Sequence, residues 1–186
     1  MSLALPFLVG AVVAMLFGGR LSALAESRFR WIGLIYVAFA FQVAAFPYSW
    51  LPWTTSDGAA IGLWIASDAI LVAVMLLNAR LRGVTLVALG LCMNLAAILA
   101  NGGHMPVLPG ALRGAGLHYQ VAMNSETMAH PALPWLVDRW AAPRWIPMSN
   151  VFSVGDVVIA VGGFVLALTV MRARPPRRLR PLASGT

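Results

Sequence analysis

The sequence predicts an all-α, polytopic membrane protein, a bundle of five transmembrane helices. Of its 186 residues, 60% are hydrophobic and only 10% are charged, whereas about a quarter of a soluble domain is charged. The mean hydropathy of +0.82 is correspondingly high. In addition, five apolar stretches are long enough to cross a bilayer core, which takes about 17–25 helical residues. These stretches are residues 3–18, 31–47, 59–78, 84–101 and 151–171.

The first stretch, residues 3–18, is the shortest and has two interpretations. Ala23-Leu24-Ala25 behind it has the small-x-small form of a signal-peptide cleavage site. However, no basic residue precedes the stretch and Arg20 follows it, which is the charge order of an anchor with its N-terminus outside. We therefore interpret it as a retained helix.

The connections between the stretches differ in charge. Ten of the thirteen basic residues, all of them arginine, lie in the link 19–30, in the turn after the third stretch and in the tail 172–186. The link 48–58 has none, and the segment 102–150 has three. By the positive-inside rule the N-terminus is outside, the segment 102–150 is extracytoplasmic and the tail is cytoplasmic. Residues 1–171 then form a single transmembrane domain in the cytoplasmic membrane.

The flanking arginines also account for the net charge of +7, so we expect membrane lipids as partners and no nucleic acid. The single cysteine, Cys92, excludes an intrachain disulfide and a cysteine-based metal site. His104, His118 and His130 lack the close spacing of metal ligands. We therefore expect neither a metal nor a cofactor.

Polar residues within the stretches fall in their outer halves. They are Gln42, Asp68, Asn94 and Asp156, with Ser153 one turn before Asp156. The inner halves are apolar, whereas a transporter needs a polar route on both sides of the midplane. This asymmetry predicts a pocket that opens to the outer face. In a simpler interpretation, Asp68 is hydrogen-bonded to Asn94 and only holds two helices together.

The end of the fourth stretch is the first informative block. It reads Asn101-Gly102-Gly103-His104 before Met105-Pro106. Glycines after a helix adopt the left-handed conformation that ends it, so the block is at least a helix stop. Glycine also lets the backbone approach a bound group closely. We therefore place these four residues at the rim of the predicted pocket.

Two aspartates form the second block. Asp138 comes before the fifth stretch and Asp156 lies within it, 18 residues later. Two carboxylates that meet are the minimum for aspartyl hydrolysis, one ionised as the base and one protonated as the acid. The alternative is that Asp138 only forms a loop ion pair with Arg139.

Several short motifs are shared with one known family. They are Asn94, Asn101-Gly102-Gly103-x-Met105-Pro106-Val107, Leu136-x-Asp138, and Phe152-Ser153-x-Gly155-Asp156 followed by Gly162. Through them nearly the whole chain resembles the domain-of-unknown-function family numbered 5317, which comprises small multi-pass membrane proteins of bacteria. This resemblance implies a membrane location and brings no established activity.

A second, local resemblance concerns the two aspartates. Val137-Asp138 and the segment 152–156 are similar to the motifs of lipoprotein signal peptidases. That resemblance implies that Asp138 and Asp156 form a catalytic dyad. The sequence departs from the peptidases at Ser153, where they have Asn, and at Arg139, where they have Phe.

Three functions remain open on these grounds. The first is a non-catalytic binding or accessory subunit, whose pocket holds a lipid-like ligand or a membrane partner. The second is an intramembrane aspartyl hydrolase. The third, which the dry inner halves disfavour, is a small transporter.

Overall fold

The structure is a computed structural model that describes residues 4–20, 22–23, 29–45, 55–118, 121–122, 124–143 and 151–172. Most of these residues are helical, as the sequence predicts. The helices are α1 (Ala4–Leu16), α3 (Ile32–Ala45), α4 (Asp57–Leu77), α5 (Val84–Ala100), α6 (Pro109–Ala115) and α7 (Val154–Met171).

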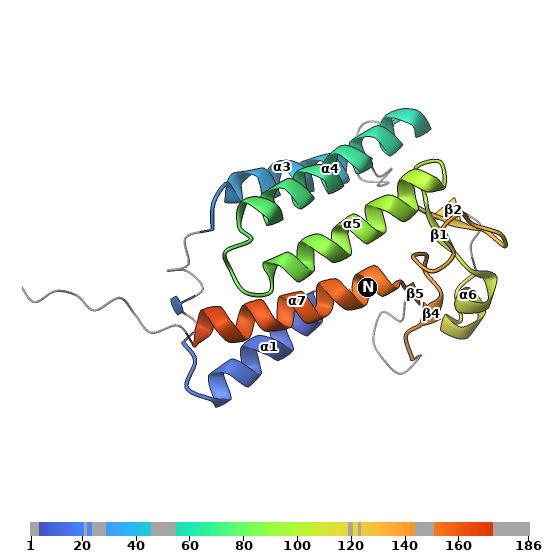
Figure 1. The fold of residues 1–186 in the computed structure, drawn as a ribbon. Helices are drawn as coiled ribbons and strands as arrows, with labels where there is room; N and C mark the ends of the chain where they lie inside the picture. Colours follow the sequence, from blue (N-terminus) through green and yellow to red (C-terminus); the bar gives the residue numbers. More distant parts are fainter. Residues whose placement is uncertain are drawn as a thin grey trace, which may run out of the picture.

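The five long helices lie side by side in a row (Figure 1). Their order is α3, α4, α5, α7 and α1, and each helix packs against the next one in this order. Helix α5 therefore occupies the centre of the row, with α4 on one side and α7 on the other.

Two of these helices, α4 and α7, are long and apolar enough to cross a membrane. Among the described residues, Gly33–Ala45 of α3 and all of α5 are apolar but shorter. Each predicted apolar stretch overlaps one of the five long helices, and the predicted and observed ends agree within three residues.

The largest of these differences is at the start of α7. The predicted stretch begins at residue 151, whereas the helix begins at Val154. The reason is a capping box. Ser153 Oγ accepts a hydrogen bond from Asp156 N, and the Asp156 carboxylate accepts one from Ser153 N, so the helix starts directly after Ser153. Asp156 consequently lies in the first turn of α7 and not deep within it.

The segment between α5 and α7 contains short strands that were not expected from the sequence. Within the described part of this segment none is longer than three residues, and such a run is too short to show an alternating pattern. Strand β3 pairs in parallel with β1 and antiparallel with β2, and β4 pairs antiparallel with β5. The strands are β1 (Met105–Val107), β2 (Val121–Ala122), β3 (Ser125–Thr127), β4 (Trp140–Ala141) and β5 (Val151–Phe152).

The two ends of the helix row differ in composition. At one end Arg20 N donates to Met171 O at the close of α7, over 2.9 Å, and Arg30 N donates to Asn78 Oδ1 over 2.7 Å. The link between α4 and α5, which carries two more arginines, lies at the same end (Figure 1). We call it the arginine end. The strands and α6 lie at the opposite end, which we call the strand end.

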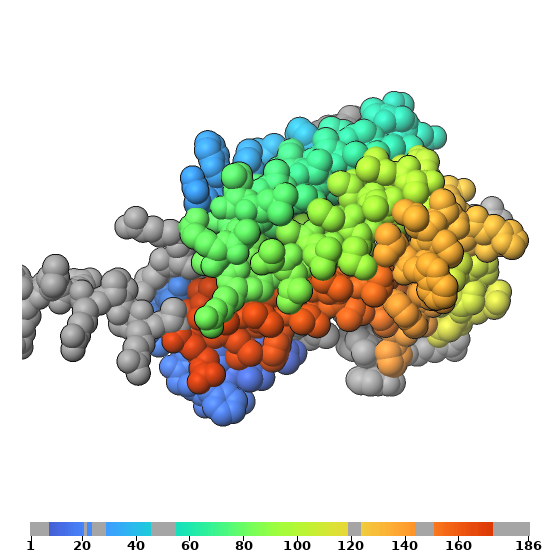
Figure 2. Space-filling view, viewed as in Figure 1, coloured from blue at the N-terminus to red at the C-terminus, as the bar shows by residue number. Residues whose placement is uncertain are grey.

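Helices α5 and α7 are in close contact because glycines line their seam. A Cβ atom on Gly162 would lie only 2.7 Å from both Gly83 O and Val87 N. Gly90 of α5 faces Gly155 of α7 in the same way, nearer the strand end. Figure 2 shows the atoms of the two helices meeting along the seam. No larger side chain fits at these positions unless the helices separate.

Candidate ligand pocket

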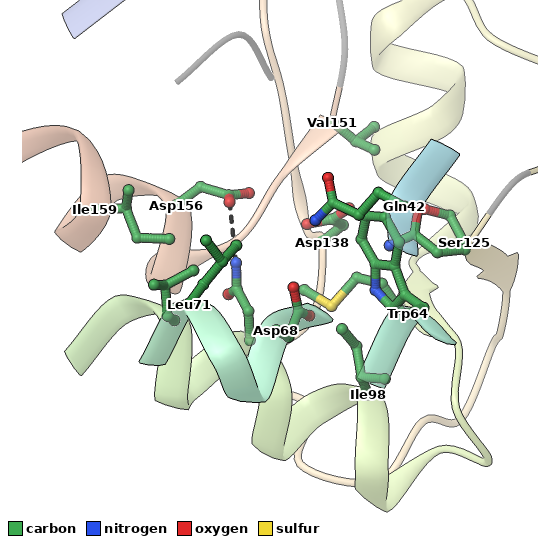
Figure 3. Close-up of a pocket in the computed structure, with 14 residues that line it drawn as sticks. Gln42, Trp64, Asp68, Leu71, Ile98, Ser125, Asp138, Val151, Asp156 and Ile159 are labelled. Atoms are coloured by element: carbon green, nitrogen blue, oxygen red, sulfur yellow. Dashed lines mark hydrogen bonds between the residues drawn. The ribbon is translucent and has the colours of Figure 1, made fainter. Parts of the chain in front are cut away.

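A pocket of about 310 Å³ lies between α4, α5, α7 and the segments at the strand end (Figure 3). Its volume is at the low end of the range for small-molecule sites, about 300–1,000 Å³. Helix α3 contributes one residue to it. The polar residues that line the pocket are Gln42, Asp68, Asn94, Asn124, Ser125, Asp138 and Asp156.

Asp156 is held in place by two donors from different elements. Asn94 Nδ2 of α5 donates to Asp156 Oδ1 over 3.0 Å, and Ser153 N donates to Asp156 Oδ2 over 3.0 Å. Ser153 Oγ in turn donates to Asn94 Oδ1 over 2.9 Å. The carboxylate therefore has a fixed position, and Asn94 connects α5 to the first turn of α7. Ser153 acts through this network and does not itself line the pocket.

Asp138 is positioned by its backbone. Its N–H donates to Pro106 O of β1 over 3.0 Å, and its carbonyl accepts from Leu108 N over 2.9 Å. The next residue, Arg139, donates its N–H to Phe152 O of β5 over 3.2 Å. Because Phe152 directly precedes Ser153, this pairing brings the segment of Asp138 to the start of α7. Asp138 and Asp156 then line the same pocket.

The Asp138 side chain lies in an unfavourable environment for a charge. It is only 8% exposed, and its Oδ1 atom has no hydrogen-bond partner among the described residues. Burial, and next the nearby Asp156 carboxylate, raise the pKa of Asp138 to about 7. A buried carboxyl oxygen without a partner is costly to the fold and can be satisfied by a donor that enters the pocket.

Asp68 and Gln42 line the pocket from the opposite side. Asp68 of α4 is buried, with 8% exposure, and Gln42 of α3 is half-buried. The interpretation of Asp68 as a partner of Asn94 is wrong, because the Asn94 side chain is bonded to Ser153 and Asp156. The seam between α5 and α7 holds Asn94 on that side.

An apolar floor closes the pocket toward the arginine end. Helices α4, α5 and α7 each contribute one apolar floor residue, which lies three positions along the helix from the polar residue that lines the pocket. Leu71 follows Asp68 on α4, Ile159 follows Asp156 on α7, and Leu91 precedes Asn94 on the oppositely directed α5. The polar lining therefore stops after about one helical turn.

The structure does not place the four-residue block after α5 in the pocket lining. Asn101 Nδ2 donates to Ala132 O over 3.0 Å and its Oδ1 accepts from Ala132 N over 2.8 Å, so Asn101 joins α5 to the segment before Asp138. Gly103 is buried against Ile61, and Gly102 is exposed. His104 Nδ1 lies 3.8 Å from a Glu126 carboxylate oxygen. Gly102 and Gly103 do adopt the left-handed conformation expected of a helix stop, with φ of 73° and 96°.

Some lining residues were missed in the sequence. Trp64 lies four positions before Asp68 on the same face of α4, a helical spacing that would have found it. Asn124 and Ser125 come from the turn before β3 and the start of that strand, where no local motif marks them.

The alternative interpretation was an ion pair between Arg139 and Asp138. The structure does not have this pair. The Arg139 guanidinium carbon lies 4.9 Å from the centre of the Trp135 ring and 5.4 Å from that of Trp140. Both distances are typical of cation–π contacts. The arginine therefore rests on the outer surface of the strand end and leaves the Asp138 carboxyl without a counter-charge from its neighbour.

The comparisons with known proteins place the chain in a family. A family of unknown function, DUF5317, matches it over residues 26–168. The chain belongs to this family. The match confirms the resemblance drawn from the motifs around Asn94, Asp138 and Asp156, and the structure brings these three residues of the DUF5317 protein to one pocket. No curated protein and no solved structure matches the chain.

Proposed function

We propose that this DUF5317 protein spans the bacterial cytoplasmic membrane five times, with its N-terminus outside and the tail 172–186 in the cytoplasm. The five long helices would be the spans. The distribution of arginines supports this orientation, since the arginine end would face the cytoplasm. The strand end, with the pocket, would face outward.

The packing of the helices also favours a membrane location. Only 17% of the apolar window of α4 and 28% of that of α7 are buried within the protein, whereas the core helix of a soluble protein is mostly buried. Small residues such as Ala14, Ala38 and Ala167 fill the space between helices. Larger apolar side chains point outward, among them Leu8, Leu16, Tyr36, Phe39 and Leu89.

Cysteine labelling tests the orientation. In a Cys92→Ser background, Gly58→Cys at the strand end of α4 should react with a membrane-impermeant maleimide added to intact spheroplasts. Ala79→Cys, in the link at the arginine end, should react only after the membrane is opened. The reverse pattern would contradict the orientation.

The proposed role of the pocket is to bind the polar group of a lipid-like or other amphipathic ligand, or of a membrane partner, at the outer face. The protein would then be a non-catalytic binding or accessory subunit. One observation carries this proposal: a buried polar wall and an apolar floor enclose a single space at the strand end. A site of this composition suits a ligand with one polar and one apolar part.

Filling the pocket tests this role. Leu91→Phe adds volume at the pocket floor, and Leu89→Phe makes the same change on the exposed face of α5. We expect native mass spectrometry of protein extracted in a mild detergent to detect a co-purifying ligand with the wild type and with Leu89→Phe. The ligand should be lost from Leu91→Phe. Equal ligand in all three proteins, or none in any, would contradict the proposal.

A second candidate, an intramembrane aspartyl hydrolase, is favoured by the two environments of the dyad residues. Asp156 accepts hydrogen bonds on both oxygens, whereas the Asp138 carboxyl is buried and has a raised pKa. In this function Asp138 would be the acid and Asp156 the base that activates water.

A peptide-cleavage assay distinguishes the hydrolase from the binding protein. The hydrolase requires that both Asp138→Asn and Asp156→Asn abolish cleavage, while Asp57→Asn, at the exposed start of α4, leaves it unchanged. Cleavage that survives in Asp156→Asn would exclude this chemistry. The third candidate, a transporter, is disfavoured by the apolar floor.

A further inference from the structure

The charges that line the pocket are all of one sign. Asp68, Asp138 and Asp156 are among its lining residues, and none of the described lining residues is an arginine or a histidine. Arg139, next to Asp138, and His104, next to the lining residue Met105, have partners elsewhere. Arg139 lies over two tryptophan rings, and His104 lies beside Glu126. The described part of the lining therefore offers carboxyl groups and no cationic side chain.

One of these carboxyl groups also lacks a donor. Asp138 is 8% exposed, lines the pocket and has an oxygen, Oδ1, without a partner among the described residues (Figure 3). Asp156, in contrast, already accepts from Asn94 and from the Ser153 backbone. A ligand that supplies both a positive charge and N–H donors would pair with the Asp138 carboxyl group. Charge-assisted hydrogen bonds of this kind are stronger than those between neutral groups.

The arrangement of the pocket favours an organic cation over a metal ion. Among the described residues no group of three His, Cys, Asp or Glu side chains is close enough to hold a metal. The three aspartates are thus spread over the pocket wall. Trp64 also lines the pocket, as do the apolar floor residues Leu71, Leu91 and Ile159, and aromatic and apolar walls suit the carbon atoms beside an ammonium group.

We infer that the pocket binds an alkylammonium group, a primary amine in its protonated form, with the nitrogen between Asp138 and Asp68 and the alkyl part on the apolar floor. This inference rests on the proposed binding function and names the chemical class of its ligand. The amine has two conceivable sources, the head group of an aminophospholipid or a free amine.

Calorimetric titration of the full chain in a non-ionic detergent tests the inference. Three probes of equal length are compared, hexylamine, 1-hexanol and hexanoate. We expect hexylamine to bind the wild type at least about tenfold more tightly than hexanol does. The reason is that hydrogen bonds to charged groups contribute more than hydrogen bonds between neutral groups. Hexanoate should bind most weakly, because its charge is repelled by the aspartates.

Matched variants locate the effect. Asp138→Asn and, from a different helix, Asp68→Asn should each remove most of the preference for hexylamine over hexanol. Asp57→Asn, which removes the same charge at the exposed start of α4, should keep it. A preference that persists in both pocket variants would overturn the inference, as would equal binding of all three probes.

The outcomes also separate the inference from the proposed function. If hexylamine and hexanol bind equally and Leu91→Phe abolishes both, the ammonium assignment fails and the binding pocket stands. If no probe binds the wild type, both fail. In a final arm, mixed micelles containing phosphatidylethanolamine or phosphatidylglycerol compete with bound hexylamine. Displacement by phosphatidylethanolamine alone identifies the lipid head group as the source, and displacement by neither identifies a free amine.

Discussion

The two sides of helix α5 pack against their neighbours in opposite ways. Toward α7, Gly83 and Gly90 bring the two backbones into contact, and no side chain separates them. Toward α4, Leu91 and Ile98 line a pocket of about 310 Å³. One side of α5 is thus in close backbone contact with its neighbour, and the other lines an open space.

The close seam determines the geometry of the open side. Gly155 lies directly beneath Asn94, and a Cβ atom at this position would overlap with Asn94 Oδ1. Because Gly155 has no side chain, the amide of Asn94 can reach both Ser153 and Asp156. The position of one acid in the pocket therefore depends on a glycine in the seam.

Breaking the seam should have the largest effect. We expect Gly162→Val to destabilise the protein by more than about 3 kcal/mol, since its side chain would meet the backbone of α5, which cannot move aside as a flexible side chain does. The expected result in detergent is loss of cooperative thermal unfolding. Gly62→Ala in α4 is the matched control. It has open space around it and should be neutral or stabilising by about 1 kcal/mol or less.

The next largest effect should come from the buried acid of the pocket. Asp138 has a pKa of about 7 in the folded protein and an ordinary value of 3.8. Between these values the folded state binds more protons than the unfolded state, so stability falls as pH rises from about 4 to about 7, by about 1.4 kcal/mol per pH unit at most. Asp138→Asn should remove this decline, as measured by chemical unfolding at pH 4.5, 6 and 8.

Other titratable groups lie near Asp138. Asp68 of α4 and Asp156 of α7 line its pocket, and the pair of His104 and Glu126 lies beside β1 and β3. The test is therefore the difference between the wild-type and Asp138→Asn profiles. Parallel profiles of the two proteins would show that Asp138 does not titrate in this range.

A smaller loss of stability is expected when the hydrogen bonds of Asn94 to the first turn of α7 are removed. Asn94→Leu removes the donor to Asp156 and the acceptor of Ser153 Oγ, and should cost about 1–3 kcal/mol, since buried polar partners are left unsatisfied. Asn94→Asp should lose stability at pH 7.5, because two carboxylates then face each other, and should recover part of it at pH 4.5, where a protonated carboxyl donates. Equal losses at both pH values would contradict the assigned hydrogen bond.

The smallest loss of stability is expected for a residue that lies outside both the seam and the pocket. Asn101→Ala removes the two hydrogen bonds to the Ala132 backbone, and we expect a loss of about 1 kcal/mol. Binding of hexylamine in the pocket should be unchanged within a factor of about two, because Asn101 does not line it. A large loss of binding would instead show that Asn101 belongs to the binding site.

Local patterns predicted the helices well and the candidate site in part. The five apolar stretches coincide with the five long helices, because the length of an apolar run and its flanking residues are local properties. Gln42, Asp68, Asn94, Asp138 and Asp156 were proposed from their depth and spacing, and all of them line one pocket.

The prediction failed where a contact joins distant segments. Asn101 was placed at the rim because of the glycines beside it, yet its partner is Ala132, 31 residues away. The strands were missed because they are too short to show an alternating pattern. Asn94 was given the wrong partner because the close packing of α5 on Gly155 directs its amide toward α7 and not toward α4.

The amino-acid sequence by itself determined the helical stretches, the positions of the arginines and the polar character of the residues toward the strand end. Hydropathy, charge and helix signals act over a few residues, so they can be read along the chain. The tertiary contacts were needed to show that α5 packs on α7 through glycines, that the pairing of β4 with β5 brings Asp138 to the pocket of Asp156, and that an oxygen of Asp138 lacks a partner among the described residues. These features depend on which surfaces meet, and that choice is made by the packing of the whole chain.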